Sequence, residues 1–536
     1  MGRQIHRRAI GKAALALPFV ASLASFGRSV GASGPSVLRA APNADLAILD
    51  PHLTAATTTL MHGLLIYDVL YALDETLAPQ PQMVAEDEVS ADKLTWQFTL
   101  RPGLKFHDGS PVTTRDVIAS LKRWMPHDAM GRVLATTTAA MEPVDQRTFR
   151  IRLKEPFPFM RFTLANSSSS VPVIMREKEA LTDTYTPIRE TIGSGPFRFV
   201  RGEWVVGSRV VYERNPDYLP RDEPPNGLAG GKKVNLDRVE FRILPDASTK
   251  SNALRLGEID FIDQLSYNQA GLLARSPGVT VGSISPINSQ GYIRFNALHP
   301  PFNNLKARQA VALTVNQADY MTAAVDKAEW WRACYSYFIC GTQNGIETGS
   351  DAYRKPDLAR AKQLLAESGY NGEKIVLLSS HDLDYIGALI DVAAYNLREL
   401  GFNVDVAESD WGTLMTRRTN KNVPTSGGWN LFVTTTPGSS LFSPLINPVT
   451  DQTCGGGNYV GWPCDAKSEE LRSAYIRAEE PAAQRSLLEA IHTRLWETLP
   501  SALLGQYTQI YGWRNNVHDI PRTPSSSIPF WGVRKT

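Results

Sequence analysis

Three residue types found in hydrolase catalytic triads stand within four positions of one another, as His107, Asp108 and Ser110 in the segment KFHDGS. A triad needs its nucleophile, base and orienting acid to converge from separated segments, so that each side chain points at the next. Here the three residues are near neighbours, and the Asp-Gly dipeptide at 108–109 is typical of a tight turn. The spacing therefore favours a structural role for His107 over a catalytic one.

The residues on either side of this turn predict a strand before it and a helix after it. Apolar and polar side chains alternate along residues 94–100, which is the pattern of a half-buried strand. Thr113 is followed three residues later by Asp116, the spacing of a helix-capping box in which the shorter acid replaces the usual Glu or Gln. The segment thus reads as strand, turn and capped helix, which accounts for its residue types without catalysis.

Other constellations that carry chemistry are weak. His381, Asp382 and Asp384 in SHDLDY are compatible with a metal cluster, but a polar loop with an acid capping the next helix is the favoured interpretation. The segment GLAGGKK lacks the spacing and the final Ser/Thr of a phosphate-binding loop, and neither G-x-S-x-G nor H-E-x-x-H occurs. We therefore expect no catalytic residues, no metal and no cofactor.

The charge distribution indicates export and argues against nucleic-acid binding. The chain of 536 residues has a formal charge of +2, but residues 1–32 hold five basic residues and no acid, so their removal leaves 2 − 5 = −3. A basic start, a 14-residue apolar run and small residues at 30–32 predict a secretory signal peptide over residues 1–32. Arg7-Arg8 fits either a twin-arginine signal or an ordinary one. No later run is long enough to span a membrane, so we expect a soluble periplasmic protein.

The cysteine usage agrees with an oxidising compartment. The four cysteines form two close pairs along the chain, Cys334 with Cys340 and Cys454 with Cys464. Neither spacing matches a zinc site or a Cys-x-x-Cys redox motif. Two local disulfides are the simplest prediction, although four cysteines allow three pairings.

The segment from 356 to 411 indicates the architecture most clearly. Residues 356–369 predict a helix that opens at Pro356 and Asp357, residues 374–380 predict a short apolar strand, and residues 385–401 predict a second helix that ends at Gly401. A strand follows directly. Helix, strand, helix and strand joined by short links are typical of an α/β lobe.

Six segments, in order, resemble one known family. They are WQFTLRPGLKFHDGSPVTTRDVIASLKR at 96–123, IGSGPFRF at 192–199, NPDY at 215–218, LRLGEIDF at 254–261, RFNALHPPFNNLKARQAV at 294–311 and DLARAKQLLAESGY at 357–370. The sequence resembles the extracellular solute-binding proteins, family 5, of bacterial ABC importers, the dipeptide-, oligopeptide- and nickel-binding group. The resemblance spans nearly all of the mature chain.

This resemblance implies an α/β fold of the two-lobed periplasmic-binding-protein type, with a hinge and an extra inserted domain. The expected divisions are lobe I at 33–77, 188–285 and 497–536, the inserted domain at 78–187, and lobe II at 286–496. Within this frame the His-Asp-Gly-Ser segment belongs to the scaffold of the inserted domain.

The resemblance also raises a question about the ligand. Peptide binders of this family commonly pair the peptide's amino terminus with an aspartate some twenty residues after a tryptophan. Trp411 stands at the tryptophan position, but residues 429–447 contain no acid, and Thr434, Thr435 and Thr436 occupy the approximate place of the aspartate. A buried ammonium without a counter-charge is costly, so an ordinary free-amine peptide is disfavoured unless an acid comes from elsewhere.

The expected function is a periplasmic receptor that closes around a small solute and delivers it to an ABC importer permease. Three threonine hydroxyls suit a neutral polar, amide, sugar-like or carboxylate ligand, and Trp411 either stacks on the ligand or packs in the core. A dipeptide or oligopeptide receptor remains open, and so do a secreted hydrolase and a sensor or chaperone built on the same fold. We expect a monomer that binds no nucleic acid.

Overall fold

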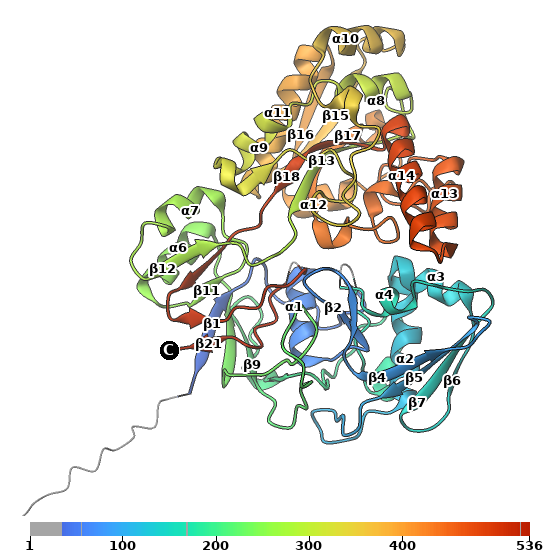
Figure 1. Cartoon of the computed structure of the whole chain (residues 1–536). Coiled ribbons are helices and arrows are strands. Elements are labelled where there is room, and N and C mark those ends of the chain that lie inside the picture. Colours follow the sequence, from blue (N-terminus) through green and yellow to red (C-terminus); the bar gives the residue numbers. More distant parts are fainter. Residues whose placement is uncertain (1–34, 55, 168–169, 526) are drawn as a thin grey trace, which may run out of the picture. The chain divides into compact units, whose positions relative to one another are not determined.

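The architecture was determined from a computed structural model, which describes residues 35–54, 56–167, 170–525 and 527–536. The predicted signal peptide at 1–32 lies outside the described residues. Within them the chain builds three main sheets, and segments distant in sequence alternate between two of these sheets (Figure 1).

The first sheet has seven strands in the order β12-β19-β11-β1-β10-β9-β8. The strands are β1 (Val37–Ala41), β8 (Phe197–Phe199), β9 (Arg209–Arg214), β10 (Arg238–Arg242), β11 (Phe261–Ile262), β12 (Val279–Gly282) and β19 (Tyr511–Arg514). β1 runs parallel to both of its neighbours, β10 and β11. Helices α1 (Thr57–Ile66), α6 (Ala247–Leu256) and α7 (Tyr267–Leu273) belong to this half, which we call lobe I.

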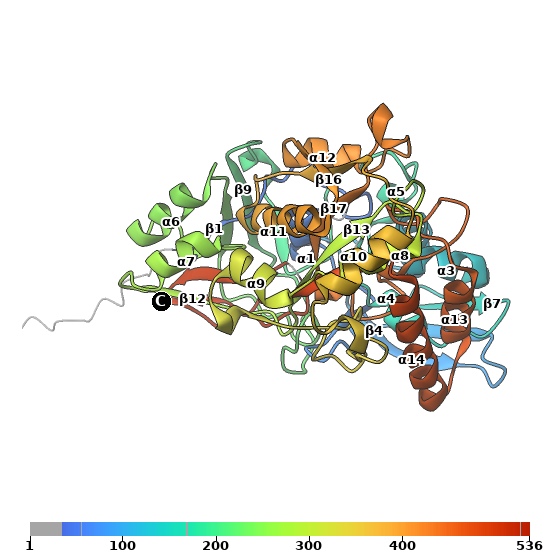
Figure 2. The same ribbon diagram turned by 90° about the horizontal axis from the view of Figure 1, so that it is seen from above.

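The second sheet has six strands in the order β14-β18-β13-β17-β15-β16. They are β13 (Ser289–Phe295), β14 (Trp331–Arg332), β15 (Lys374–Ser379), β16 (Asn403–Glu408), β17 (Leu431–Pro437) and β18 (Ser501–Tyr507). The helices are α8 (Leu305–Ala312), α9 (Gln317–Val325), α10 (Leu358–Glu367), α11 (Asp384–Leu400), α12 (Trp411–Arg417), α13 (Ala466–Arg477) and α14 (Pro481–Thr498). This half is lobe II, and Figure 2 shows α8 to α11 gathered around its strands.

The predicted helix, strand, helix and strand of residues 356–411 are present in lobe II. Asp357 accepts a hydrogen bond from the backbone N–H of Arg360 and caps α10, and Gly401 ends α11 in the left-handed conformation, with φ of 114°. β15 has four consecutive apolar residues, 375–378, between Lys374 and Ser379, and it is buried after Lys374 because apolar clusters cover both faces of this parallel part of the sheet. The α/β assignment is therefore confirmed.

The third sheet forms the extra domain and has the order β4-β5-β7-β6. Its strands are β4 (Val84–Val89), β5 (Thr95–Leu100), β6 (Thr138–Pro143) and β7 (Thr148–Leu153), accompanied by α2 (Thr114–Trp124), α3 (Ala129–Thr137) and α4 (Met160–Leu164). The rings of Phe98 and Phe149 stack across β5 and β7 with centroids 5.0 Å apart. At the start of α2 the Asp116 carboxylate accepts the backbone N–H of Thr113 at 2.8 Å, as the capping-box spacing predicts.

His107 has a structural role in this domain. Its Nε2 lies 3.1 Å from the carbonyl oxygen of Gly195, and its Nδ1 accepts from the N–H of Gly193 at 3.3 Å. Burial lowers the pKa of the imidazole to about 4, so the ring is neutral and can accept at one nitrogen while donating at the other. It therefore ties the turn after β5 to the IGSGP segment of lobe I.

The chain passes twice between the sheets of the two lobes. One crossing is residues 283–288, between β12 and β13, and the other is residues 508–510, between β18 and β19. The expected boundary at 497 precedes β18, which pairs with β13 in the lobe II sheet. The chain thus returns from the lobe II sheet to the lobe I sheet only after β18, later than residue 497. The full division into domains stays a prediction.

Both local disulfides are present in lobe II. Cys334 is bonded to Cys340 and Cys454 to Cys464, with Cα–Cα separations of 5.8 Å and 4.7 Å. Of the three pairings that the sequence allows, the structure has the one that joins the nearest neighbours along the chain.

Candidate functional site

A cavity of about 180 Å³ lies between the two lobes, at the crossings. Lobe I contributes one wall, the two crossing segments contribute the back, and α11, α12 and β17 of lobe II contribute the other wall. The lining residues are Asn43, Thr57, Gln264, Ser285, Ile287, Ser289, Leu383, Tyr385, Ile386, Trp411, Thr434, Thr435, Pro437, Ser439, Tyr507, Gln509, Tyr511, Pro524 and Ser525.

The lining of this cavity carries no charged side chain among the described residues. Its polar groups are hydroxyls and amides, and its largest apolar surfaces are one indole and three phenol rings. Such a wall binds by ring contact and by neutral hydrogen bonds, and it offers neither a carboxylate to an ammonium nor a guanidinium to a carboxylate.

Two of the three predicted threonines line the cavity. Thr434 and Thr435 lie near the end of β17 and belong to the lining, and Thr435 Oγ1 accepts from the Tyr507 hydroxyl at 3.0 Å. Thr436 is not part of the lining. Its Oγ1 lies 3.0 Å from the hydroxyl of Tyr292, so it joins a side-chain network behind the wall.

Trp411 also lines the cavity and is the first residue of α12. The Asp410 side chain caps this helix through the backbone N–H of Thr413, and Asp382 accepts the N–H of Trp411 itself at 2.7 Å. The ring is half-buried and packs beside the cluster that contains Trp429 and Phe432. The indole thus packs on the core, as one interpretation of the sequence expects, and also presents surface to the cavity, while its stacking on a ligand stays a prediction.

Two tyrosines that sequence reasoning missed face the same cavity. Tyr385 stands in the first turn of α11, and Tyr507 ends β18; their ring centroids lie 5.6 Å apart. Burial raises the pKa of both phenols, so both keep their protons and can donate hydrogen bonds. No motif in the sequence marks either tyrosine, because each comes to the cavity through the packing of its own element.

One buried acid lies directly behind the lobe I wall. Asp263 follows β11 and is flanked by Gln264, and in the described part of the chain neither of its carboxylate oxygens makes a hydrogen bond of full geometry, although the backbone N–H groups of Asn43 and Gln264 lie nearby. Burial raises its pKa to about 7, opposed by the Lys250 ammonium and by the backbone N–H groups of Asn43 and Gln264. The Lys250 ammonium itself donates to the carbonyl oxygen of Pro42 at 2.7 Å.

The SHDLDY segment has a different role from the predicted one. Leu383 occupies the N-cap position of α11, and no side chain there hydrogen-bonds to the first turn. The prediction that an acid caps this helix is therefore wrong. Asp382 instead bonds to α12, and Asp384 reaches lobe I, where it accepts from Asn268 Nδ2 at 2.9 Å and Ser266 Oγ at 3.2 Å. His381 is held between Glu408 and Asp391 on the surface. Asp382 therefore links the start of α11 to α12, and Asp384 links it to lobe I.

The described residues contain one compact group of metal-ligating types, formed by Cys334, Cys340 and Glu347. Its two sulfur atoms are bonded to each other, so they are not available as thiolate ligands. No helix in the described part of the chain has the length and hydropathy needed to cross a bilayer.

Comparison with known proteins accounts for this arrangement of two lobes around a cavity. Residues 78–448 match the family described as bacterial extracellular solute-binding proteins, family 5 Middle. The chain belongs to this family. A relative from Sinorhizobium fredii (strain NBRC 101917 / NGR234), described as the probable peptide ABC transporter periplasmic-binding protein y4tO, is 36% identical over 510 residues, covering 94% of each chain.

Solved structures share the fold. The PBP AgaA of A. tumefaciens R10, in complex with agropinic acid, superposes with a TM-score of 0.77 at 22% identity, over 93% of this chain and 99% of that one. A dipeptide-binding protein from Pseudoalteromonas sp. SM9913, in complex with Met-Leu, gives a TM-score of 0.77 at 19% identity, over 93% and 100%. Members of this family are receptors that bind small solutes and work with ABC importers in the membrane, and this protein is a solute-binding receptor of that kind.

Proposed function

We propose that this receptor captures a small polar solute in the cavity between its lobes and delivers it to an ABC importer permease. The lobe II contacts are Trp411, Thr434 and Thr435, joined by the phenols of Tyr385 and Tyr507. Thr436 supports them from behind through Tyr292. Contact with both lobes at once favours the closed arrangement, which is the form that carries the solute.

The uncharged lining is the observation that supports this ligand class. A free ammonium placed against this wall loses its hydration without gaining a counter-charge, which costs several kcal/mol. An amide, a sugar-like hydroxyl or a carboxylate oxygen finds donors in the threonines and tyrosines, and a planar group finds the indole. We further propose that the receptor acts as a periplasmic monomer, exported by the Sec or twin-arginine route, and that it acts by binding alone.

A second candidate is a receptor for ordinary peptides. Two observations favour it: the printed description of the relative that is 36% identical, and the buried Asp263 behind the lobe I wall. In that case the amine-pairing acid comes from lobe I, and Asp263 ionises when the peptide's ammonium reaches it. The substitution D263N removes the charge with little change of shape and therefore separates the two candidates.

Thermal unfolding of residues 33–536 against a solute panel tests both. The panel pairs free dipeptides such as Gly-Leu with N-acetyl-Gly-Leu, and adds sugars, opines and aromatic acids. A solute at a hundred times its dissociation constant stabilises the fold by about 2.7 kcal/mol. We expect neutral or anionic solutes to raise the midpoint while free dipeptides do not. A rise with Gly-Leu that vanishes in D263N refutes the main ligand class and establishes the second candidate.

A further inference from the structure

A second set of contacts joins lobe II to the extra domain, and none of its residues lines the solute cavity. Phe159, just before α4, stacks on Tyr475 of α13 with centroids 5.4 Å apart and planes 20° apart. Phe162 of α4 meets Phe442, which follows β17, edge to face at 5.6 Å. Phe442 and Tyr475 are both only 5% exposed, so these are packed ring contacts.

Two ion pairs of opposite polarity lie beside the rings. Lys93, in the turn between β4 and β5, pairs with Glu479, between α13 and α14. The second pair joins Arg477 Nε to Glu155 Oε2 at 3.5 Å. The extra domain thus presents a cation and an anion, and lobe II presents the complementary anion and cation. This arrangement selects one alignment of the two surfaces.

The position of these contacts is distinct from that of the crossings. In Figure 1, α13 and α14 stand above α3 and α4 on one side of the molecule, whereas β13 and β18 descend toward lobe I on the other side. Figure 2 shows the same separation from above. Since displacement in a hinge rotation grows with distance from the hinge, contacts far from the crossings separate before those beside the cavity do.

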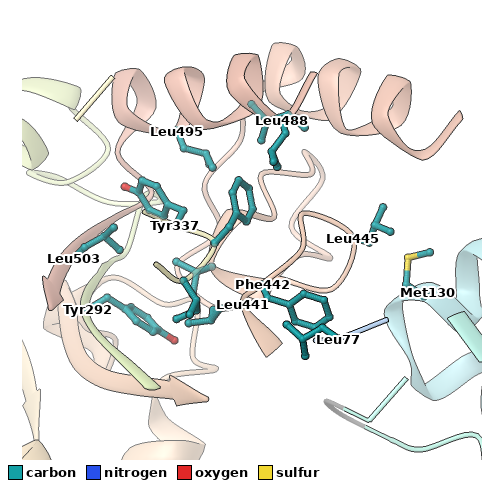
Figure 3. Packing of buried hydrophobic residues seen from close by; sticks show 14 of the residues in the cluster. Leu77, Met130, Tyr292, Tyr337, Leu441, Phe442, Leu445, Leu488, Leu495 and Leu503 are labelled. Carbon is teal, nitrogen blue, oxygen red and sulfur yellow. The ribbon is translucent and has the colours of Figure 1, made fainter. Parts of the chain in front are cut away.

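The apolar surface is continuous through this region. One cluster of buried side chains includes Leu77 and Met130 from the first part of the chain together with Phe442 and Leu445 of lobe II. Figure 3 shows Phe442 directed toward Leu77, and Met130 and Leu445 facing the same space. Opening of the lobes therefore exposes apolar surface here as well as at the cavity.

We propose that these four side-chain pairs form a clasp that holds the receptor closed, and that the extra domain serves to carry one half of it. The clasp acts at a distance from the solute, so it sets the ratio of closed to open protein. Its effect on solute affinity rests on the proposed function, because that effect requires the cavity between the lobes to be the solute site.

This role has a quantitative signature. Only the fraction of protein in the competent arrangement binds, so the apparent dissociation constant scales inversely with that fraction. Weakening the clasp therefore lowers the affinity for every solute by the same factor, whereas a change in the cavity wall alters the affinities for different solutes unequally.

The distance between the two halves is the direct test, and it needs no solute. The described cysteines are all in disulfides, so spin labels on introduced cysteines report single sites. We choose A139C on β6 and A483C on α14, both exposed positions on opposite sides of the clasp. The distance distribution is measured by pulsed electron paramagnetic resonance in the labelled parent, in K93E, in F159A and in the exchanged pair K93E/E479K.

We expect K93E to raise the ratio of long to short distances about two- to fivefold, the scale of one exposed ion pair, and F159A about two- to tenfold, the scale of one aromatic pair. The exchanged pair restores the parent distribution. K374E is the matched control, because it makes the same charge change in a lobe II pair, Lys374 with Asp405, away from the clasp. It leaves the distribution unchanged.

Unfolding midpoints within a few degrees of the parent show that the labelled variants are folded. In folded variants, an unchanged distribution in both K93E and F159A overturns the clasp, whatever the solute panel gives. If the panel finds binders, K93E must lower their affinities by one common factor, and unequal losses also overturn it. A panel without binders contradicts the proposed function alone, since the distance measurement stands without solute.

Discussion

Replacing Asp263 by asparagine should remove most of one pH-dependent contribution to the stability of the protein. Asp263 is fully buried, and burial raises its pKa from 3.8 to about 7. A shift of about three units corresponds to about 4 kcal/mol at 1.36 kcal/mol per unit. In D263N the amide cannot ionise, so this contribution disappears.

The direction follows from which state holds the proton. Between about pH 4 and pH 7 the folded protein keeps a proton on Asp263 that the unfolded chain has already released. The free energy of unfolding therefore falls as the pH rises through this interval, and the loss is complete above about pH 7. Relative to D263N, the parent protein should lose about 4 kcal/mol of stability between pH 4 and pH 8.

Urea unfolding at half-unit steps from pH 4 to pH 8 measures this difference. The control is D222N, which makes the same chemical change at an exposed position in a lobe I loop and should leave the parent's pH profile unchanged. If the profiles of D263N and the parent run parallel, Asp263 is ionised throughout this pH range, and burial does not raise its pKa in the way described.

Three further predictions concern the cavity, the disulfides and the scaffold. T434V should lower solute affinity about tenfold by calorimetry, because it removes a hydroxyl from the lining, whereas T436V should have a smaller effect; equal effects would argue against direct contact by Thr434. Replacing Cys454 and Cys464 together by serine should lower the free energy of urea unfolding by about 2–3 kcal/mol, and no change would mean that the loop is ordered without the bond. Relative to H107Q, the parent should lose up to about 3 kcal/mol of stability as the pH falls from 6.5 to 4, because the imidazole takes up its proton at a higher pH in the unfolded chain than in the folded protein. Parallel acid-unfolding curves for the two proteins would refute the buried neutral ring.

The scaffold was largely predictable from sequence because its signals are local. The cap formed by Thr113 and Asp116 and the end of α11 at Gly401 depend on residues a few positions apart. The acid cap expected for α11 failed because Asp382 and Asp384 bond to partners distant in sequence. The pairing of β18 with β13 likewise joins residues about two hundred positions apart. Pairing across the fold has no local signal.

The candidate site was predictable on one wall only. Trp411, Thr434 and Thr435 are predicted from the spacing at which the family resemblance implies a tryptophan and a later aspartate, and they line the cavity of the structure. The opposite wall combines residues near 43, 264 and 511, which come together only after the chain has crossed twice between sheets. Their amide and phenol side chains are common in loops, so nothing in the sequence sets them apart.

The uncharged lining of the cavity has a consequence for the medium in which the receptor works. At ordinary ionic strength dissolved ions screen exposed charges beyond about 8–10 Å, so receptors that attract solutes by exposed charge lose affinity as salinity rises. A wall of hydroxyls, amides and rings has no such dependence. Capture by this protein should therefore stay constant while the salinity outside the cell changes, which suits a compartment that exchanges small ions freely with its surroundings.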